Sequence, residues 1–316
     1  MSGVSDGASQ YHRLMPNEVT ELIARLWPGR AFEVVPLSSG ITNANFMVDL
    51  GDDQVVVRIP GEHTELLGID RRQESAANRL AASIGIAPPV LAESVEEGWL
   101  VSQFLKGRTV SAHELASEPL LVEVGTTLRR VHSAGTIEKY FDPFTIVRDY
   151  HRTAQERGVA EPFDYLGALS VLERIEAVRP FRPMRFCHND LLNGNFIYDE
   201  RLRILDWEYA GMGDPMFDLA NLSVNHAFTP ESDEHLLRHY FGRSGDGSLA
   251  VLALMKLVSE LREAMWGVVQ LAVSTLDVDF AAYAGERAQR FTALLEAMDF
   301  DELLANAGPV VNDPDY

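Results

Sequence analysis

The residue types that could perform metal-dependent chemistry lie close together in one segment of the chain. Asp190 stands in a polar loop, Asn195 follows in the same loop, and Asp206 comes after a short apolar run. We expect two short strands between Asn195 and Asp206, joined by a turn over residues 199–202. A symmetric hairpin would put Asn195 and Asp206 opposite each other at its open end, about 5 Å apart, where an amide and a carboxylate oxygen can share a hard cation.

A free carboxylate beside such an Asn–Asp pair is what phosphoryl transfer requires. The metal neutralises charge on the phosphate, and the carboxylate orients the attacking hydroxyl and takes its proton. Asp190 is therefore the candidate base. We expect His188 to shape the loop through hydrogen bonds, with a satisfied core histidine as an equal alternative. The competing interpretation of the whole segment is a surface hairpin with ordinary turn residues, which the ordered set of three side chains disfavours.

Composition excludes several other classes of function. The 316 residues suggest one large domain or two lobes. A net charge of −20 makes nucleic acid and anionic membranes poor partners and would attract a cationic ligand. The single cysteine, Cys187, excludes an internal disulfide and a multi-thiolate zinc site. With no signal-peptide pattern and no long uncharged apolar run, the chain is expected to be soluble and cytoplasmic.

The first part of the chain has the pattern of a small β-rich lobe. Residues 1–14 are small and polar and are expected to be disordered. Asp70 has the position of a helix N-cap, with Gln73 in the capping-box position, and Gly85 ends that helix. The expected strands cover residues 32–37, 46–50, 55–59, 90–94 and 99–104, within an N-terminal lobe of residues 15–105.

Beyond the Lys106-Gly107 linker the pattern becomes helical. Apolar residues recur at spacings of three and four, and one short β insert at residues 186–205 interrupts them. A β-rich lobe, a linker and a helical lobe form an architecture that binds a ligand between the lobes. The expected helices cover residues 114–133, 164–178, 231–241, 249–273 and 279–298, in a C-terminal lobe of residues 106–305 followed by a tail at 306–316.

The order of these motifs resembles a known family. The H-x-D-x-x-x-x-N run from His188 to Asn195, followed by Asp206, is similar to the eukaryotic-like kinase superfamily, in its aminoglycoside phosphotransferase and choline/ethanolamine kinase branch. The run Leu205-Asp206-Trp207-Glu208-Tyr209 looks like the choline kinase version of the magnesium motif. The resemblance covers roughly residues 32–300. It implies an α+β, bilobal protein-kinase-like fold, with a small β-rich N-lobe and a larger, mostly helical C-lobe.

The same resemblance implies roles for the central residues. Asp190 would be the catalytic base, and Asn195 and Asp206 would hold Mg²⁺. Asp218 would be structural, bracing the catalytic loop. Glu208, in the magnesium motif, is taken as a candidate contact for the substrate.

The small lobe should then bind ATP. The run from Ser38 to Asn45 is short, polar and contains one glycine, so its backbone N–H groups can approach phosphates. Alone it would be read as a plain turn, but its place between two strands resembles the family's S-G-G-x-T-N-x-x-Y/F loop. The candidate ATP contacts here are Ser39, Gly40, Thr42, Asn43 and Asn45.

Arg58 occupies the third strand's usual lysine position in the family. A guanidinium grips phosphate with two parallel bonds and keeps its charge. Glu74 heads an otherwise apolar helix face and needs a cation, for which Arg58 is the natural partner. The alternative is a Glu74 half-solvated at the helix N-terminus. Gln103, Phe104 and Leu105 should form the hinge that offers backbone groups to adenine.

The substrate must be recognised by the helical lobe. Trp266-Gly267-Val268-Val269-Gln270 and the run from Phe280 to Ala284, with Tyr283, resemble the aromatic walls around the cation in choline kinases. Packing as core filler is an equal alternative.

Two departures from the family matter, since Asn225 stands where a Glu is usual and Glu263 where a Trp is usual. We expect Glu263 to supply the missing negative charge and to favour a smaller or less methylated amine. The candidate substrate contacts are Asp190, Glu208, Asn225, Glu263, Trp266, Phe280 and Tyr283.

Three functions are consistent with this sequence. The leading hypothesis is an ATP- and Mg²⁺-dependent kinase for the hydroxyl of a small amino alcohol such as choline or ethanolamine. The second is a kinase of the same fold for an aminoglycoside, amino sugar or thiamine-like alcohol. The third is a nucleotide-binding pseudokinase, which the intact Asp190, Asn195 and Asp206 disfavour. The sequence predicts no oligomeric state.

Overall fold

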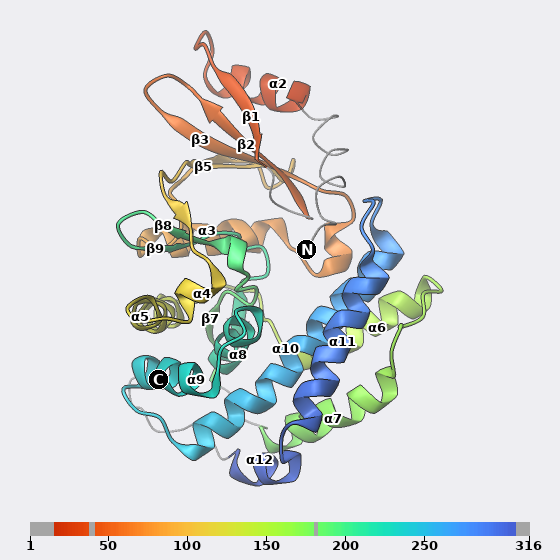
Figure 1. Ribbon diagram of the computed structural model, residues 1–316. Coiled ribbons are helices and arrows are strands. Elements are labelled where there is room, and N and C mark those ends of the chain that lie inside the picture. The colour runs from red at the N-terminus through yellow and green to blue at the C-terminus, as the bar shows by residue number, and fades with distance from the viewer. Residues whose placement is uncertain (1–15, 38–41, 180–182, 308–316) are drawn as a thin grey trace.

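A five-stranded antiparallel sheet forms the N-terminal lobe, and helices form most of the C-terminal lobe (Figure 1). The computed structural model describes residues 16–37, 42–179 and 183–307, so the expected N-terminal tail and most of the C-terminal tail lie outside it. The expected α+β, two-lobed fold is confirmed. The sheet has the order β1-β2-β3-β5-β4, with β1 at Glu33–Leu37, β2 at Asn43–Asp49, β3 at Gln54–Pro60, β4 at Val90–Glu93 and β5 at Leu100–Gln103.

The strands expected at residues 46–50 and 55–59 are present and pair as the antiparallel hairpin of β2 and β3. Phe46 and Val48 of β2 are fully buried, and so is Val57 of β3. These alternating side chains pack against helix α2 (Pro16–Leu26) at the top of Figure 1, a helix that our sequence analysis did not predict. The backbone N–H of Leu50 donates to the carbonyl of Asp53 over 2.8 Å and closes the turn.

Helix α3 (Arg71–Ser83) begins at the expected N-cap, because the Asp70 carboxylate accepts the backbone N–H groups of Arg72 and Gln73. The expected capping box is wrong. The Gln73 side chain reaches the Glu138 carboxylate and the Lys139 N–H instead of returning to Asp70. Tertiary partners from the other lobe therefore replace the local bond that the spacing favoured.

The C-terminal lobe contains more helices than the sequence indicated. The expected helix at 114–133 is divided, since Pro119 lacks a backbone N–H and cannot continue a helix. Helices α6 and α8 were not predicted. The helices are α4 (Ala112–Leu115), α5 (Leu120–His132), α6 (Pro143–Glu156), α7 (Tyr165–Val178), α8 (Pro215–Asn225), α9 (Pro230–Phe241), α10 (Asp246–Val273), α11 (Phe280–Glu296) and α12 (Phe300–Asn306).

Short strands and turns lie between the longer elements of both lobes, including the expected β insert. The short elements are η1 (Thr64–Leu67), β6 (Arg108–Thr109), β7 (Arg185–Cys187), η2 (Asn193–Asn195), β8 (Phe196–Tyr198), β9 (Leu202–Ile204) and β10 (Gly211–Gly213).

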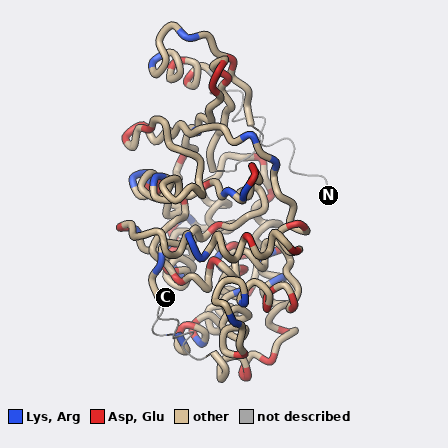
Figure 2. The backbone as a smooth tube through the Cα atoms, turned by 90° about the vertical axis from the view of Figure 1, so that its left-hand side faces the viewer, with Lys and Arg blue, Asp and Glu red and all other residues tan. Residues whose placement is uncertain are grey.

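Helix α10 is the centre of the C-terminal lobe. It runs diagonally through the lobe in Figure 1, and every residue from 257 to 270 is buried. Polar side chains in that run therefore lie inside the protein, where they need partners. Among the described residues, no helix is long and apolar enough to cross a bilayer. Figure 2 shows Asp and Glu in both lobes, with Lys and Arg interspersed among them.

The linker between the lobes packs directly on the β8–β9 hairpin. Strand β6 pairs with β8, placing Thr109 opposite Ile197. A Cβ at Gly107 would lie 2.5 Å from Ile197 Cγ2 and 2.7 Å from the Tyr198 carbonyl, so only glycine fits there. The residues after the expected hinge are thus fixed to the hairpin that begins beside Asn195.

Candidate active site

The loop that carries Asp190 is held by helix α8. The Asp218 carboxylate accepts the backbone N–H groups of His188 over 2.8 Å and Asn189 over 2.6 Å. Asn221, one helical turn later, accepts the N–H of Leu191 over 2.6 Å. These bonds let Asn189 keep a left-handed φ of 67°, which turns the chain sharply before Asp190.

His188 lies under the loop as a hydrogen-bonding residue. Its Nε2 is 2.8 Å from the Leu205 carbonyl, and its Nδ1 is 3.2 Å from the backbone N–H of Asp190. These partners assign a neutral ring with the proton on Nε2. Burial lowers the pKa of His188, in agreement with the neutral form. His188 therefore connects the Asp190 loop to the residue before Asp206.

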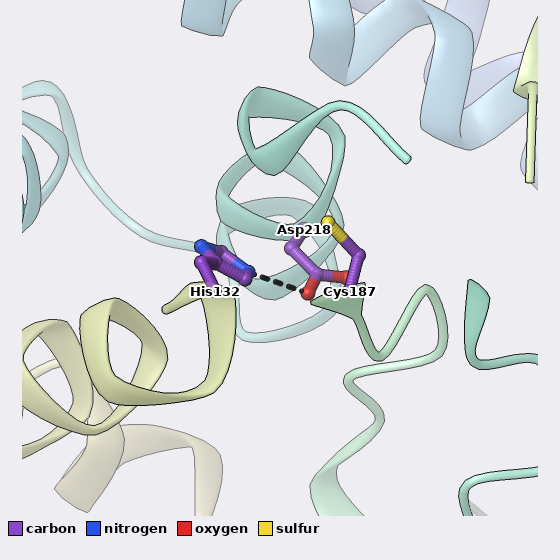
Figure 3. A group of neighbouring side chains, drawn as sticks. All are labelled: His132, Cys187 and Asp218. Atoms are coloured by element: carbon purple, nitrogen blue, oxygen red, sulfur yellow. Dashed lines mark hydrogen bonds and ion pairs between the residues drawn. The ribbon is translucent and has the colours of Figure 1, made fainter. Parts of the chain in front are cut away.

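A second layer of buried groups lies behind this loop (Figure 3). His132 Nε2 donates to Asp218 over 2.9 Å, and Tyr240 donates its hydroxyl proton to His132 Nδ1 over 2.7 Å. The Cys187 sulfur lies in the same group. Burial raises the pKa of Cys187 well above its usual range, so it stays a thiol. Asp218 therefore accepts hydrogen bonds from His132 and from two backbone N–H groups of the Asp190 loop, so these buried residues brace that loop. Our sequence analysis did not identify His132.

The β8–β9 hairpin has a register one residue away from the expected one. Phe196 pairs with Ile204, and the N–H of Leu205 donates to the Asn195 carbonyl over 2.9 Å. The expected direct pairing of Asn195 with Asp206 is therefore wrong. Asp206 follows with a left-handed φ of 63°, which turns it back toward the hairpin end.

Asn195 and Asp190 nevertheless contact each other at this end, and burial together with the charge of Asp206 raises the pKa of Asp190. The Asn195 amide donates to the Asp190 carbonyl over 2.9 Å, and Asp206 Oδ1 is buried without a hydrogen-bond partner in the described part of the chain. Carboxylate oxygens of Glu74, Asp206 and Glu208 lie within 4.8 Å of one another. Burial, and then Glu208, raise the pKa of Asp206 to about 7. A cluster of oxygen ligands with an unsatisfied carboxylate fits Mg²⁺, which would keep Asp206 ionised.

The expected pairing of Arg58 with Glu74 is present as a buried ion pair. Burial lowers the pKa of Arg58 to about 10, which leaves it charged at neutral pH. Arg71 contacts the other Glu74 oxygen over 2.8 Å and lies 3.4 Å from Glu208. It also donates to Asn43 over 3.0 Å. Our sequence analysis did not identify Arg71, although its position beside the Asp70 cap put it at the same helix end as Glu74.

The other expected ATP contacts that the structure describes lie at and before the start of β2, an inner strand of the N-terminal sheet. Ser39 and Gly40 fall outside the described residues. Thr42 precedes β2, Asn43 begins it, and Asn45 pairs across the strands with Arg58.

The expected hinge begins at Gln103, the last residue of β5, and continues through Phe104 and Leu105. Phe104 donates its N–H to the Gln54 carbonyl over 3.0 Å, and Leu105 is half-buried.

Glu208 contacts a residue of the N-terminal lobe. Its Oε2 accepts the Asn43 amide over 2.8 Å. Lys139, which the sequence gave no reason to select, donates to its carbonyl over 3.2 Å. Burial lowers the pKa of Lys139 to about 8. These bonds do not test whether Glu208 contacts the substrate, so that role stays a prediction.

The expected aromatic residues do meet. The Trp266 ring is edge-on to Phe280 at 6.0 Å and to Tyr283 at 5.6 Å between ring centroids. The indole N–H of Trp266 donates to the Tyr209 hydroxyl over 2.9 Å. This cluster joins α10 and α11 to the segment that follows Asp206.

Glu263 does not offer a free charge, contrary to our expectation. It is 2% exposed, and its two carboxylate oxygens bond to Arg262 and to the Tyr283 hydroxyl, the latter over 2.7 Å. Asn225 likewise accepts from Arg287 over 3.1 Å. The charge that we assigned to the substrate cation is therefore balanced inside the protein.

Asp190 lies between the metal-ligand candidates and α10. It is 8% exposed, and Arg262 Nη1 is 3.5 Å from its Oδ1. Burial raises the pKa of the Asp190 carboxyl well above its usual range, while Arg262 acts in the opposite direction. This arrangement offers a hydrogen-bond acceptor for a hydroxyl beside a site suited to a metal and phosphates.

Comparison with known proteins identifies the family. The phosphotransferase enzyme family model matches residues 33–254, which is most of the chain and includes the whole loop and hairpin. The chain belongs to this family. It is a phosphotransferase enzyme with an alcohol group as acceptor.

Individual members of the phosphotransferase enzyme family are similar to this chain over much of its length. Protein LicA of Haemophilus influenzae is 30% identical over 215 residues, covering 65% of this chain and 62% of its own. The probable choline kinase 3 of Arabidopsis thaliana is 26% identical, covering 83% of this chain and 86% of its own. The solved structure of a choline/ethanolamine kinase family protein from Mesorhizobium loti has a TM-score of 0.80 and 31% identity, covering 92% of this chain and 98% of its own.

Proposed function

We propose that this phosphotransferase is an ATP- and Mg²⁺-dependent kinase for the hydroxyl of a small amino alcohol of the choline or ethanolamine type. The observation that supports the proposal is the contact of Asn195 with Asp190 beside the β8–β9 hairpin, together with the buried, unsatisfied Asp206 carboxylate two residues after that hairpin. The names of the relatives, choline kinase and choline/ethanolamine kinase family protein, support the acceptor class.

The residues present can divide the reaction between them. Mg²⁺, when held by Asn195 and Asp206, would neutralise charge on the phosphates. Arg58 is a candidate to hold the inner phosphates with its forked guanidinium. Asp190 accepts a hydrogen bond from the acceptor hydroxyl and takes its proton as the new bond to the γ-phosphorus forms and the bond to ADP breaks. Catalysis is then mostly positioning and charge neutralisation.

The acceptor's ammonium group has aromatic partners available. Trp266, Tyr283 and Tyr209 form one cluster beside the Asp190 loop. Ring faces attract an ammonium ion by about 0.5–2 kcal/mol each. Since Glu263 is already paired, the rings and Asp190 are the groups that we assign to cation recognition.

The experiment is a screen of purified protein for ADP release. The panel contains choline, ethanolamine, an aminoglycoside, an amino sugar and thiamine, each with and without Mg²⁺. We expect Mg²⁺-dependent turnover with an amino alcohol. Turnover with an aminoglycoside, amino sugar or thiamine alone would overturn the substrate class but keep the kinase. Nucleotide binding without any acceptor consumed would favour the pseudokinase.

A further inference from the structure

A buried arginine contacts the candidate base from the helical lobe. Arg262 lies in the fully buried part of α10 and is 1% exposed. Its Nη1 is 3.5 Å from Asp190 Oδ1. The loop bonds from Asp218 and Asn221 hold the backbone around Asp190. Within the described residues, Arg262 is the one hydrogen-bond partner recorded for the Asp190 carboxylate itself.

Arg262 is in turn fixed by its neighbours. Its Nη1 also pairs with Glu263, whose second oxygen accepts the Tyr283 hydroxyl. The guanidinium lies 4.5 Å from the centre of the Tyr209 ring. A continuous set of contacts therefore runs from Asp190 through Arg262 and Glu263 to Tyr283 on α11.

Core packing alone does not explain Arg262. A buried guanidinium loses its hydration, and this one leaves Nε and Nη2 without partners among the described residues. A well-packed apolar residue is often at least as stabilising as a buried ion pair. Arg262 is charged, buried in the centre of α10 and incompletely hydrogen-bonded. A role in the reaction, through its contact with Asp190, would explain why a charged residue stands there.

We propose that Arg262 is a positioning residue that fixes the direction of the Asp190 carboxylate and connects it, through Glu263, to the acceptor side at Tyr283. The inference rests on the proposed function, because Asp190 matters only as the base of that reaction. The proposal also assigns a role to Glu263, which holds Arg262 in place instead of contacting the substrate.

The test compares R262Q, R262K and K256Q with the wild type. Lys256 is a matched control, because it also lies on α10 and pairs with a carboxylate, Asp233, but does not touch Asp190. We expect R262Q to lose about 10²-fold in kcat with unchanged nucleotide affinity, as misplacement of a reacting group does. R262K should have a kcat about tenfold higher than that of R262Q. K256Q should lower Tm but keep kcat within about twofold of the wild type.

Crystal structures of the wild type and R262Q with a non-hydrolysable ATP analogue would show the orientation of the Asp190 carboxylate directly. We expect the Asp190 carboxylate to rotate in R262Q while the His188 and Asn189 N–H groups stay on Asp218. An unmoved carboxylate, or R262K no better than R262Q, would overturn the inference. If no acceptor is phosphorylated by the wild type, the proposed function fails, and the two structures still decide the role of Arg262.

Discussion

The side-chain amide of Asn43 donates a 2.8 Å hydrogen bond to the carboxylate of Glu208. Asn43 begins β2 in the N-terminal lobe, and Glu208 follows the catalytic hairpin in the other lobe, so this bond joins the two. Arg71 contacts both residues and also Glu74. Asn43, the Arg58–Glu74 pair and the acidic cluster of Glu74, Asp206 and Glu208 therefore form one connected set of polar groups.

Asn43→Ala should weaken nucleotide binding, because it removes this bond at the junction of the lobes. A hydrogen bond to a charged group contributes about 1.5–3 kcal/mol to stability. We expect affinity to fall about tenfold, because the start of β2 is then no longer held against Glu208. Isothermal titration with Mg²⁺ and an ATP analogue measures it. Gln54→Ala, which removes an amide bond to Asp49 in the same sheet, is the control and should leave the affinity unchanged.

Asp206→Asn should abolish the effect of Mg²⁺ on nucleotide binding. An amide is a weaker ligand than a carboxylate for a hard cation, and Asp206 supplies the unsatisfied oxygen of the acidic cluster. The dissociation constant for ATP in Mg²⁺ and in EDTA should become equal. Asp199→Asn, in the turn of the same hairpin, serves as the control. If Mg²⁺ still tightened binding to Asp206→Asn as in the wild type, the metal assignment would be wrong.

Trp266→Leu should raise KM for the amine without changing KM for MgATP. The loss of one ring face corresponds to about 0.5–2 kcal/mol, or about a 2- to 30-fold increase. Tyr283→Phe keeps the ring and removes only the hydroxyl that donates to Glu263, so its effect on amine KM should be smaller. Initial-rate kinetics with both substrates varied provide the measurement. Equal effects on the two KM values would indicate general disruption of α10.

The stability of the protein should respond to pH through His226. Burial lowers the pKa of His226, and its Nε2 has no partner within the described residues. The folded state therefore prefers the neutral ring, while the unfolded chain titrates near about 6.5. This contribution to stability is complete above that pH and is lost progressively as the pH falls from there through the lower pKa of the folded state.

The readout is the difference in Tm between the wild type and His226→Gln from pH 8 to pH 5. Because glutamine does not titrate, the wild type should lose Tm relative to the variant as the pH falls. Other titrating groups are common to both proteins and cancel. A constant difference, or a gain for the wild type in acid, would contradict the prediction.

Local patterns in the sequence predicted much of this molecule. The two β-rich runs at residues 46–50 and 55–59, on either side of the Gly51-Asp52-Asp53 turn, predict the β2–β3 hairpin. The spacing of Asp190 and Asn195 predicts the contact between them beside the β8–β9 hairpin. The lone carboxylate on the apolar face of α3, Glu74, predicted its pairing with Arg58. These features depend on short-range periodicity or on a buried charge that needs a partner.

Features that depend on tertiary contacts were not predictable in the same way. In the structure Asn195 lies opposite Leu205 and not opposite Asp206. The assumption of a symmetric hairpin could not distinguish these two registers, which differ by one residue. Gln73 leaves its capping position because Glu138 and Lys139 from the other lobe bond to it. We predicted that Glu263 faces the substrate. Helical spacing could not indicate its pairing with the adjacent Arg262.

The central claim is tested most directly by transfer of the radiolabelled γ-phosphate of ATP to choline or ethanolamine by the wild type and by Asp190→Asn. We predict a labelled phosphate ester of the amino alcohol from the wild type and a rate lower by about 10²–10⁴-fold for the variant, the usual contribution of a general base, with nucleotide affinity retained. Transfer by Asp190→Asn at the wild-type rate would contradict the account.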